Sequence, residues 1–374
     1  GKGTPVGLWL PSRPEFVALF YGAAMIGAVV APLSTLAARR ELDFLLRHPD
    51  IALLFTQSAL LRRSFAEDLF ALCPELASAE PGQLLAARFP YLRRVVMLDT
   101  ETATGAVETW ESFIARGDRI PDAVLDAAAQ QVHESDPAVI VYSSGTTAEP
   151  KGILYAQRAP AIQSWNMGQL FRRDESVRMW TPFPLFWSAG IATAMGGVLA
   201  AGGCFVMQET FDPAEAIELI ARERVTEPYV TRGHQSAAME ELPGWRAADF
   251  SCVRQAGGKA AFLRHPSVTA PDPAWTQPTG FGMSESCAIF AAHAADVSSE
   301  ARGGSHGRLL PGNALRILDP ETGEVLGIGE TGEIAIRGPT LMERYVKKSR
   351  EECFDAEGFF RTGDGGWFDA SGQL

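Results

Sequence analysis

The chain has 374 residues, of which 46% are hydrophobic and 21% charged, enough for roughly two or three domains with a substantial core. Lys and Arg together number 33 and Asp and Glu 45, a formal net charge of −12. This acidic balance excludes a broad electrostatic surface for nucleic acid or for an anionic membrane. A phosphate-bearing ligand would need a local site that binds it against the overall charge.

The cysteine and histidine patterns argue against a disulfide or metal-bound scaffold and favour a reducing compartment. The five cysteines lie far apart and form no CxxC pair, which argues against a disulfide framework or a zinc ribbon. The six histidines show no HxxxH or HExxH spacing, so a dedicated histidine metal site is not expected. We expect a cytoplasmic protein in a reducing compartment.

Two uncharged stretches, residues 16–38 and 179–208, are long enough to span a bilayer. Glycines and prolines interrupt both, so they predict buried helix, turn and strand pieces and no membrane span. The start of the chain does not resemble a signal peptide. It enters a strand pattern without an initiator methionine, which suggests a piece of a longer protein.

The first 142 residues predict strands and helices in alternation, as in a parallel sheet covered on both faces. Ser12 is the expected N-cap of the first helix, with Pro14 in its first turn. Residues 103–136 predict a surface excursion that ends in a helix. The expected strands are residues 6–10, 29–32, 51–56, 95–98 and 138–142, and the expected helices are 16–26, 36–48 and, less regularly, 60–87.

The remainder continues the α/β pattern and then changes character. Residues 179–208 predict a strand–helix–strand unit. Helices are expected at 161–172, 213–224 and 235–241, and strands at 227–231, 252–256 and 275–279. Alternating strands at 314–318 and 332–337 surround a turn-rich segment. We therefore expect an α/β body over residues 1–307 and a smaller β-rich lobe over residues 308–374.

The segment YSSGTTAEPKG follows a predicted β-branched strand. Hydroxyl side chains and backbone N–H groups of such a loop can surround a polyphosphate, and the lysine adds a compact positive charge. The segment lacks the GxxxxGK order of a Walker loop. The residues predicted to bind phosphate are Ser143, Ser144, Gly145, Thr146, Thr147 and Lys151.

This loop resembles the signature loop, SGTTGxPKG, of the adenylate-forming superfamily, which includes acyl-CoA synthetases, peptide-synthetase adenylation domains and luciferases. Ala148 replaces the usual glycine. GFGMSE at 280–285 resembles the family's GYGMTE motif, and FRTGD at 360–364 resembles its YRTGD motif. Residues 304–312 and 332–345 match in the same order. The resemblance covers nearly the whole chain and implies mixed sheet subdomains covered by helices plus the smaller β-rich lobe.

The resemblance implies that a carboxylate attacks the α-phosphate of ATP, giving acyl-AMP and pyrophosphate, before the acyl group passes to a thiol. Thr146, Thr147 and Lys151 would act on the phosphates. Glu285 would be catalytic through a bound Mg²⁺, a cation that suits one carboxylate plus phosphate oxygens. The ribose hydroxyls would bind Asp364. Other nucleotide contacts would come from Gly258, Lys259, Ala260, Phe281, Gly282, Met283 and Ser284.

The acyl pocket is expected around Trp187, which takes the position of a family histidine. Residues 186–189 hold no carboxylate that could pair with a substrate ammonium, which argues against an α-amino acid. The neighbouring residues are uncharged and predict a hydrophobic acid. The predicted pocket residues are Trp187, Ser188, Gly190, Ile191, Gly257 and Cys287, with Met283 nearby.

By resemblance, the chain is the N-terminal ATP-binding portion of an acyl- or aryl-CoA synthetase, with its active site where the body meets the β-rich lobe. The hinge and small C-terminal domain, with its lysine, would lie outside it, so turnover by this portion alone should be weak. An acyl-AMP ligase or adenylation domain that loads carrier-protein phosphopantetheine instead of CoA is the nearest alternative, and a non-catalytic nucleotide- or acyl-binding module is another. The acid and the oligomeric state stay open.

Two further segments match known motifs in their residue order but lack the structural context that each motif requires. GGSHG at 303–307 fits GxSxG, but no buried strand precedes it and no helix can follow it, as a hydrolase elbow requires. GIGETG at 327–332 fits GxGxxG, but no helix is expected after it. Neither a serine hydrolase nor a dinucleotide-binding protein is therefore expected.

Overall fold

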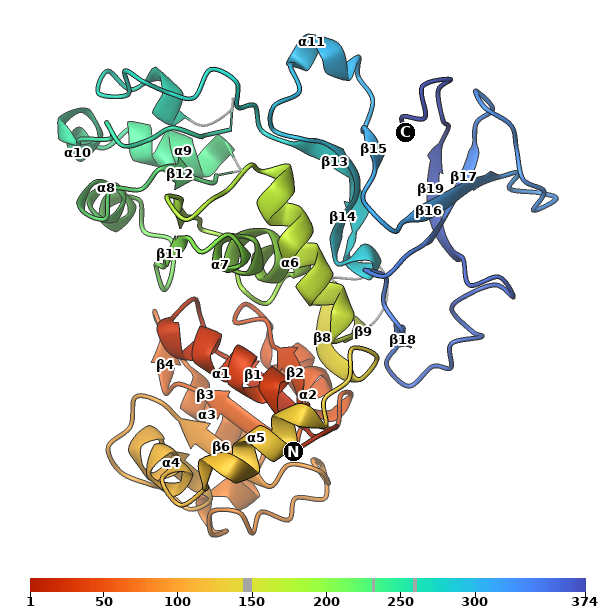
Figure 1. Ribbon diagram of the computed structural model, residues 1–374. Helices are drawn as coiled ribbons and strands as arrows, with labels where there is room; N and C mark the ends of the chain where they lie inside the picture. The colour runs from red at the N-terminus through yellow and green to blue at the C-terminus, as the bar shows by residue number, and fades with distance from the viewer. Residues whose placement is uncertain (144–149, 231–232, 258–260) are drawn as a thin grey trace. The chain divides into compact units, whose positions relative to one another are not determined.

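The computed structural model describes residues 1–143, 150–230, 233–257 and 261–374 (Figure 1). The chain is an α/β protein with two compact units. Residues 1–157 and 343–347 form the first unit, and residues 158–342 and 348–374 form the second. Residues 308–374 contribute only strands among the elements of the second unit. The boundary expected at residue 308 stays a prediction.

The first unit is built on an eight-stranded mixed sheet in the order β18-β9-β8-β2-β1-β3-β6-β7. Neighbours from β8 to β7 run parallel, whereas β9 is antiparallel to both β8 and β18. The strands are β1 (Pro5–Trp9), β2 (Val29–Pro32), β3 (Leu53–Thr56), β6 (Arg94–Met97), β7 (Val107–Thr109), β8 (Pro137–Ser143), β9 (Lys151–Ala156) and β18 (Arg344–Tyr345).

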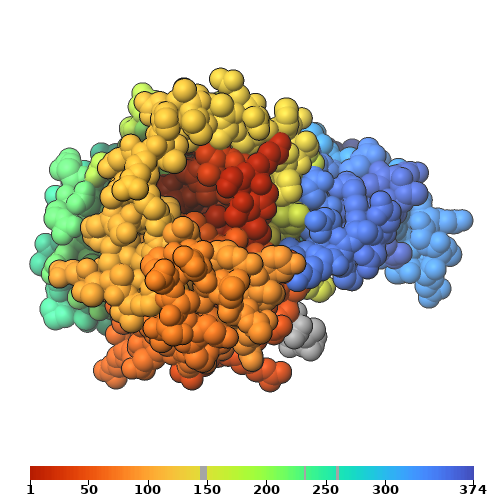
Figure 2. All heavy atoms as spheres, turned by 90° about the horizontal axis from the view of Figure 1, so that it is seen from below, coloured from red at the N-terminus to blue at the C-terminus, as the bar shows by residue number. Residues whose placement is uncertain are grey.

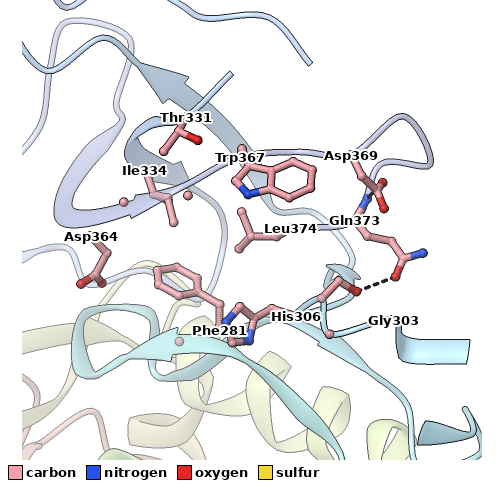
Figure 3. A pocket seen from close by; sticks show the side chains of 15 residues that line it. Phe281, Gly303, His306, Thr331, Ile334, Asp364, Trp367, Asp369, Gln373 and Leu374 are labelled. Carbon is pink, nitrogen blue, oxygen red and sulfur yellow. Dashed lines mark hydrogen bonds between the residues drawn. The ribbon is translucent and has the colours of Figure 1, made fainter. Parts of the chain in front are cut away.

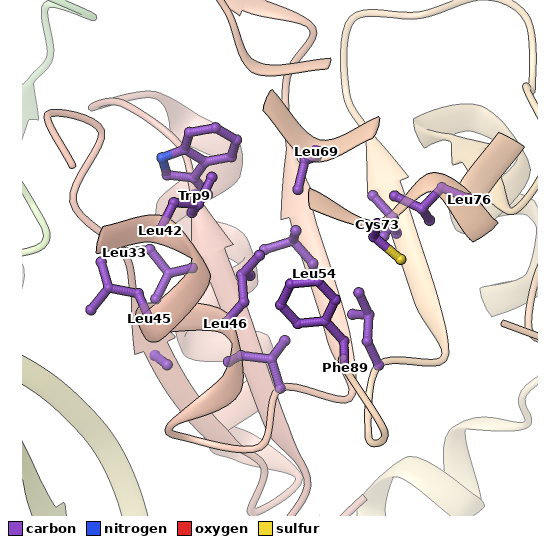
Figure 4. Close-up of a cluster of buried hydrophobic side chains, with 14 of the residues drawn as sticks. Trp9, Leu33, Leu42, Leu45, Leu46, Leu54, Leu69, Cys73, Leu76 and Phe89 are labelled. Carbon is purple, nitrogen blue, oxygen red and sulfur yellow. The ribbon is translucent and has the colours of Figure 1, made fainter. Parts of the chain in front are cut away.

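Helices accompany this sheet and bury its core. Trp9, Leu54 and Phe89 meet side chains of the neighbouring helices in one apolar cluster (Figure 4). No residue of α4 or α5 is buried, and the orange and gold segments that contain them lie on the surface in Figure 2. The helices are α1 (Pro14–Met25), α2 (Arg39–Arg47), α3 (Phe65–Leu72), α4 (Trp110–Gly117) and α5 (Asp122–Gln130).

Two local expectations for this unit are wrong. Residues 60–87 do not form one helix: β4 (Ala59–Leu60) pairs with β5 (Arg63–Ser64), α3 follows, and a 3₁₀ turn, η1 (Pro74–Ala77), comes next. Leu61 turns the chain with a φ of 55°, and Pro74 has no N–H to continue α3. Ser12 does not cap α1; the N-cap is Arg13, whose guanidinium pairs with Glu15.

The second unit begins with a three-stranded parallel sheet in the order β11-β10-β12. Between β10 and β11 lies η2, a π-helix whose seven residues are all buried. The elements are α6 (Arg158–Leu170), β10 (Arg178–Trp180), η2 (Gly190–Gly196), α7 (Gly197–Ala200), β11 (Cys204–Val206), α8 (Pro213–Arg222), β12 (Glu227–Pro228), α9 (Gly233–Glu240), α10 (Pro243–Ala247) and η3 (Ala261–Arg264).

A fully buried ion pair crosses this part of the second unit. The Arg173 guanidinium donates to both carboxylate oxygens of Glu227, at 2.8 and 2.7 Å, and neither side chain is exposed to solvent. Arg173 also donates to the Thr193 carbonyl of η2 and lies 4.4 Å from the centroid of the Phe171 ring. The pair thus links the segment that follows α6 to β12 and η2.

Two antiparallel sheets complete the second unit. One has the order β13-β14-β15 and the other β16-β17-β19. The elements are β13 (Thr279–Met283), η4 (Ser284–Ser286), β14 (Ala288–His293), α11 (Ser299–Arg302), β15 (Arg308–Leu309), β16 (Ala314–Leu318), β17 (Gly332–Arg337) and β19 (Phe360–Gly366).

The strands expected at 252–256 and 275–279 are not formed as predicted. The N–H groups of Arg254 and Gln255 both donate to one carbonyl, that of Thr226, so no ladder develops there. The second strand, β13, begins only at Thr279, directly after Pro278, which has no N–H for a ladder. In the part of the chain that the structure describes, no helix has the length and apolarity needed to cross a bilayer.

Candidate functional site

The residues that flank the predicted phosphate loop lie at paired positions in the sheet of the first unit. Ser143, the last residue of β8, is the register partner of Lys151, the first residue of β9. The antiparallel ladder therefore holds the two ends of the loop side by side. The predicted residues Ser144, Gly145, Thr146 and Thr147 lie outside the described residues.

Aromatic side chains support the exit of this loop. Lys151 is exposed, and its Nζ lies 5.3 Å from the centroid of the Tyr345 ring on β18. Gly152 leaves no room for a larger residue without movement, because an added Cβ would come within 3.1 Å of the Tyr142 ring. The Tyr142 hydroxyl is 2.9 Å from His48 Nδ1, and burial raises the Tyr142 pKa, so the phenol stays neutral.

The GFGMSE motif lies on the β13–β14 hairpin of the second unit, and its glycines are required by the ladder. A Cβ on Gly280 would collide with the Ala291 carbonyl, and one on Gly282 with the Ala288 carbonyl. The register shifts between Phe281 and Gly282, which marks an irregularity typical of a β-bulge next to a functional site.

Glu285 follows this strand in the single 3₁₀ turn η4 and is 8% exposed. Its carbonyl accepts a hydrogen bond of 2.8 Å from Met342 N–H. Ser286 Oγ accepts from Met283 N–H at 3.1 Å and closes the turn, while Cys287 adopts a φ of 56°. The turn fixes the backbone of a carboxylate, the kind of hard oxygen ligand that Mg²⁺ takes.

Asp364 lies on β19 and is exposed. Its N–H donates to Thr362 Oγ1 at 3.1 Å, and the Thr362 hydroxyl donates to the Ile334 carbonyl on β17 at 2.8 Å. Nearby, the Arg361 guanidinium pairs with Glu333 on β17. The Asp364 carboxylate accepts no hydrogen bond from the described residues, so it is open to a ligand with hydroxyl donors.

Three of the predicted nucleotide residues share one cavity of about 760 Å³ in the second unit. Figure 3 shows the side chains of Phe281 and Asp364 at this cavity, and Gly282 also lines it. Its volume lies within the range of small-molecule sites. Further residues that were not predicted from the sequence also line it, among them His306, Trp367 and Leu374. An aromatic three residues after Asp364 was the available signal for Trp367.

The predicted acyl segment is largely buried. Ser188, Gly190 and Ile191 are buried, and Gly190 lies so close to the Pro184 carbonyl that a Cβ would collide with it. Trp187 is half-buried, with its ring centroid 5.9 Å from that of Phe183. An uncharged, tightly packed segment of this kind suits contact with an apolar group.

A chain of contacts joins Trp187 to Gly257. Phe183 lies edge-on to Tyr229 at 5.5 Å between ring centroids, and the Gln277 side chain interacts with Tyr229 and acts to lower its pKa. Gln277 in turn lies against Gly257. Burial raises the Tyr229 pKa to about 12, so its hydroxyl stays protonated. Gly258, Lys259 and Ala260 lie outside the described residues.

Cys287, the remaining predicted pocket residue, is 1% exposed. Burial raises the pKa of its thiol to about 12, so the sulfur is a neutral packing group and no nucleophile. Met283 and Ser284 precede Glu285 at the end of β13 and in η4.

The GxSxG segment forms a structural turn. Ser305 Oγ is 2.7 Å from His293 Nε2 and donates to Gln373 Oε1 at 2.7 Å. The segment lies between the short helix α11 and the two-residue strand β15, so it lacks the strand-to-helix arrangement of a hydrolase elbow. The GxGxxG segment leads into β17 and likewise precedes no helix.

This arrangement agrees with the families and structures that the chain resembles. The chain is 29% identical over 366 residues to the indoleacetate–CoA ligase of Aromatoleum aromaticum, covering 97% of this chain and 66% of that protein. It is 28% identical over 391 residues to 4-coumarate–CoA ligase 1 of Oryza sativa subsp. japonica, covering 100% and 64%. The chain thus spans about two thirds of the length of these curated relatives.

A solved structure with the same fold is the N-terminal domain of FACL13 from Mycobacterium tuberculosis. It has a TM-score of 0.72 and 24% identity, with 100% of this chain and 86% of that chain covered. The family model described as "AMP-binding enzyme" matches residues 1–346. With most of its length matched, including every motif up to β18, the chain belongs to the AMP-binding enzyme family.

Proposed function

We propose that this protein activates a carboxylic acid with ATP, releasing pyrophosphate and forming acyl-AMP, and then transfers the acyl group to the thiol of CoA. The observation that carries this proposal is the family match over residues 1–346, with motif residues Phe281, Gly282 and Asp364 lining one cavity. The curated relatives named above are CoA ligases. The protein is thus an acid–thiol ligase.

Positioning and charge stabilisation account for most of the chemistry of such a reaction. Lys151, with Ser143 and the loop between them, would hold the phosphates of ATP and follow pyrophosphate as it leaves. Asp364 would accept hydrogen bonds from the ribose hydroxyls, and Phe281 would lie against the base. Glu285 would hold a Mg²⁺ that neutralises phosphate charge. Its carboxylate, on a fixed turn, fits that cation.

The acid is hydrophobic and has no α-ammonium. The support is the uncharged, buried segment around Trp187, Gly190 and Ile191, together with the buried Cys287. The relatives named for indoleacetate and 4-coumarate make aryl acids the first compounds to test. A pyrophosphate-release screen with aryl, aliphatic and polycyclic acids would identify the class, and we place the reaction in the cytoplasm.

The decisive test is pyrophosphate exchange by a longer form of the protein that includes a C-terminal domain. Glu285→Ala should abolish Mg²⁺-dependent exchange and Lys151→Ala should weaken it strongly, whereas Lys348→Ala, an exposed lysine outside the motifs, should not. Exchange unchanged by Glu285→Ala would overturn the assignment of Mg²⁺. No exchange with any acid, despite ATP binding, would favour a non-catalytic binding module.

The thiol acceptor is tested in the same longer form. CoA and a phosphopantetheinylated carrier protein are offered separately to the acyl-AMP intermediate. Thioester formation with CoA supports the proposal, whereas transfer only to the carrier identifies an acyl-AMP ligase or adenylation domain. Equal exchange rates for residues 1–374 and for the longer form would contradict the expectation that this portion alone turns over weakly.

A further inference from the structure

Four arginines surround a second cavity of the second unit, of about 510 Å³, that no part of the proposed reaction uses. Arg178 is the first residue of β10, and Arg222 and Arg224 stand at and just beyond the end of α8. Arg254 belongs to the irregular segment after α10. The other lining residues are Ser176, Glu223, Thr226 and Cys252.

The backbone around this cavity is cross-linked by one residue, Thr226. Its N–H donates to the Arg178 carbonyl at 2.9 Å, and its Oγ1 accepts from Arg178 N–H at 2.9 Å. Its carbonyl accepts from Arg254 N–H at 2.9 Å. The segments that carry two of the arginines are therefore held in place before any ligand arrives, which lowers the entropy cost of binding.

Glu223 pairs with two of the four guanidinium groups, so the lining keeps an excess of positive charge. Its carboxylate bridges Arg178, at 3.1 Å, and Arg222, at 3.2 Å. The lining thus holds four guanidinium groups and one carboxylate. The Arg224 guanidinium makes no hydrogen bond or ion pair with the described residues and interacts electrostatically with Asp249, which lies outside the lining, and Arg222 is 68% exposed at its side chain. Like charges gathered in this way repel one another unless an anion lies between them.

We propose that this arginine pocket is a binding site for a phosphoryl anion, either free phosphate or pyrophosphate or the phosphate of a small phosphomonoester. Guanidinium groups bind phosphate oxygens through paired N–H donors, and the Thr226 hydroxyl lies in the same lining. The cavity has room for a small organic phosphate. Its positive charge stands out on a chain with a formal net charge of −12.

The pocket is separate from the predicted acyl segment. Arg178 and Thr226 stand at the amino ends of β10 and β12, whereas Thr181 to Trp187 and Tyr229 follow the carboxyl ends of the same parallel strands. Ligands of the reaction in open α/β sheets gather at carboxyl ends. The anion site therefore does not depend on the proposed function.

Cys252 gives a local readout, because it lines the pocket and is half-buried. The chain is treated with iodoacetamide, a neutral reagent, with and without pyrophosphate, inorganic phosphate or glycerol 3-phosphate at matched ionic strength. Mass spectrometry follows alkylation of Cys252, with the half-buried Cys353 as internal reference. At about ten times the Kd, a bound anion should slow Cys252 alkylation about tenfold and leave Cys353 unchanged.

The variant Arg222→Gln/Arg224→Gln should lose this protection and keep its circular dichroism spectrum. Arg246→Gln, an exposed arginine on α10, is the matched control and should retain the protection. Cys252 alkylation that is indifferent to all three phosphates would overturn the proposal. Protection that persists in the double variant, or that citrate reproduces at the same concentration, would overturn the assignment to a phosphoryl ligand at these arginines.

Discussion

Lys151 and Tyr345, almost two hundred residues apart in the chain, lie together on neighbouring strands of one sheet, with Lys151 Nζ 5.3 Å from the centroid of the Tyr345 ring. Tyr345 pairs with Ile153 in the ladder, and Lys151 precedes Ile153 by two residues, so both side chains project from the same face. The aromatic ring therefore positions the cation at the exit of the predicted phosphate loop.

Replacing Tyr345 by Ala should weaken ATP binding modestly, because Lys151 loses a cation–π contact worth about 0.5–1 kcal/mol at an exposed site. Tyr345→Phe keeps the ring and should bind ATP like the parent. Titration calorimetry on this chain would measure both dissociation constants. Equal affinities for the Ala and Phe variants would show that the contact does not position the lysine.

The glycines of the β13–β14 hairpin should tolerate no side chain. Gly280→Ala and Gly282→Ala push a Cβ against a carbonyl of the paired strand, and overpacking of this kind costs about 1–3 kcal/mol. Gly244→Ala is the matched control, because nothing lies near its Cβ on the short helix α10. Urea denaturation would compare the free energies of unfolding, and a hairpin variant as stable as the control would contradict the close approach.

Breaking the buried pair of Arg173 and Glu227 should destabilise the second unit. Glu227→Gln leaves a guanidinium without its counter-charge in a solvent-free site, which costs about 3–5 kcal/mol. The double variant Arg173→Met/Glu227→Leu removes both charges and should recover most of that loss. If the single and double variants unfold at the same urea concentration, the ion pair does not account for the effect.

His293 should make stability depend on pH. Burial, aided by Arg302 and His306, lowers its pKa below the ordinary 6.5, so the folded protein favours the neutral ring. The stabilisation from the neutral His293 ring is complete at pH values above the pKa that His293 has in the unfolded chain. It is lost as pH falls through the folded pKa, because the unfolded chain then binds the proton more readily.

The variant His293→Gln keeps a donor for Ser305 Oγ and removes the titrating group. Between about pH 7.5 and pH 5.5 the parent should lose more free energy of unfolding than this variant does. Urea denaturation at both pH values measures the difference. If the parent and the variant lose the same free energy of unfolding between the two pH values, His293 is not the source of the pH dependence.

Sequence patterns predicted the elements whose signal is local. Val29–Pro32 and Pro137–Ser143 are buried strands, and their apolar runs are enough to identify them. The sequence did not reveal that Lys151 begins a strand, because β9 owes its existence to pairing with β8 and with the distant β18. Strand formation that depends on distant partners has no local signature.

The candidate site follows the same rule. Phe281, Gly282 and Asp364 were predicted from motifs, and the three residues line one cavity. Trp367 and Leu374 line this cavity because of the path that the chain takes after β19, which no motif indicates. The arginine pocket was likewise invisible in the sequence, because its arginines are brought together by Thr226 and the end of α8.

Strand β18 is synthesised long after its partner β9, and this order affects folding during synthesis. Residues 1–157 emerge from the ribosome long before Arg344 and Tyr345, so β9 stays an open sheet edge while residues 158–342 of the second unit are being made. An unpaired edge invites pairing with other chains. The unit that carries the phosphate loop therefore reaches its final form only after residues 1–345 have emerged, and a chaperone that covers β9 during that interval would protect it from aggregation.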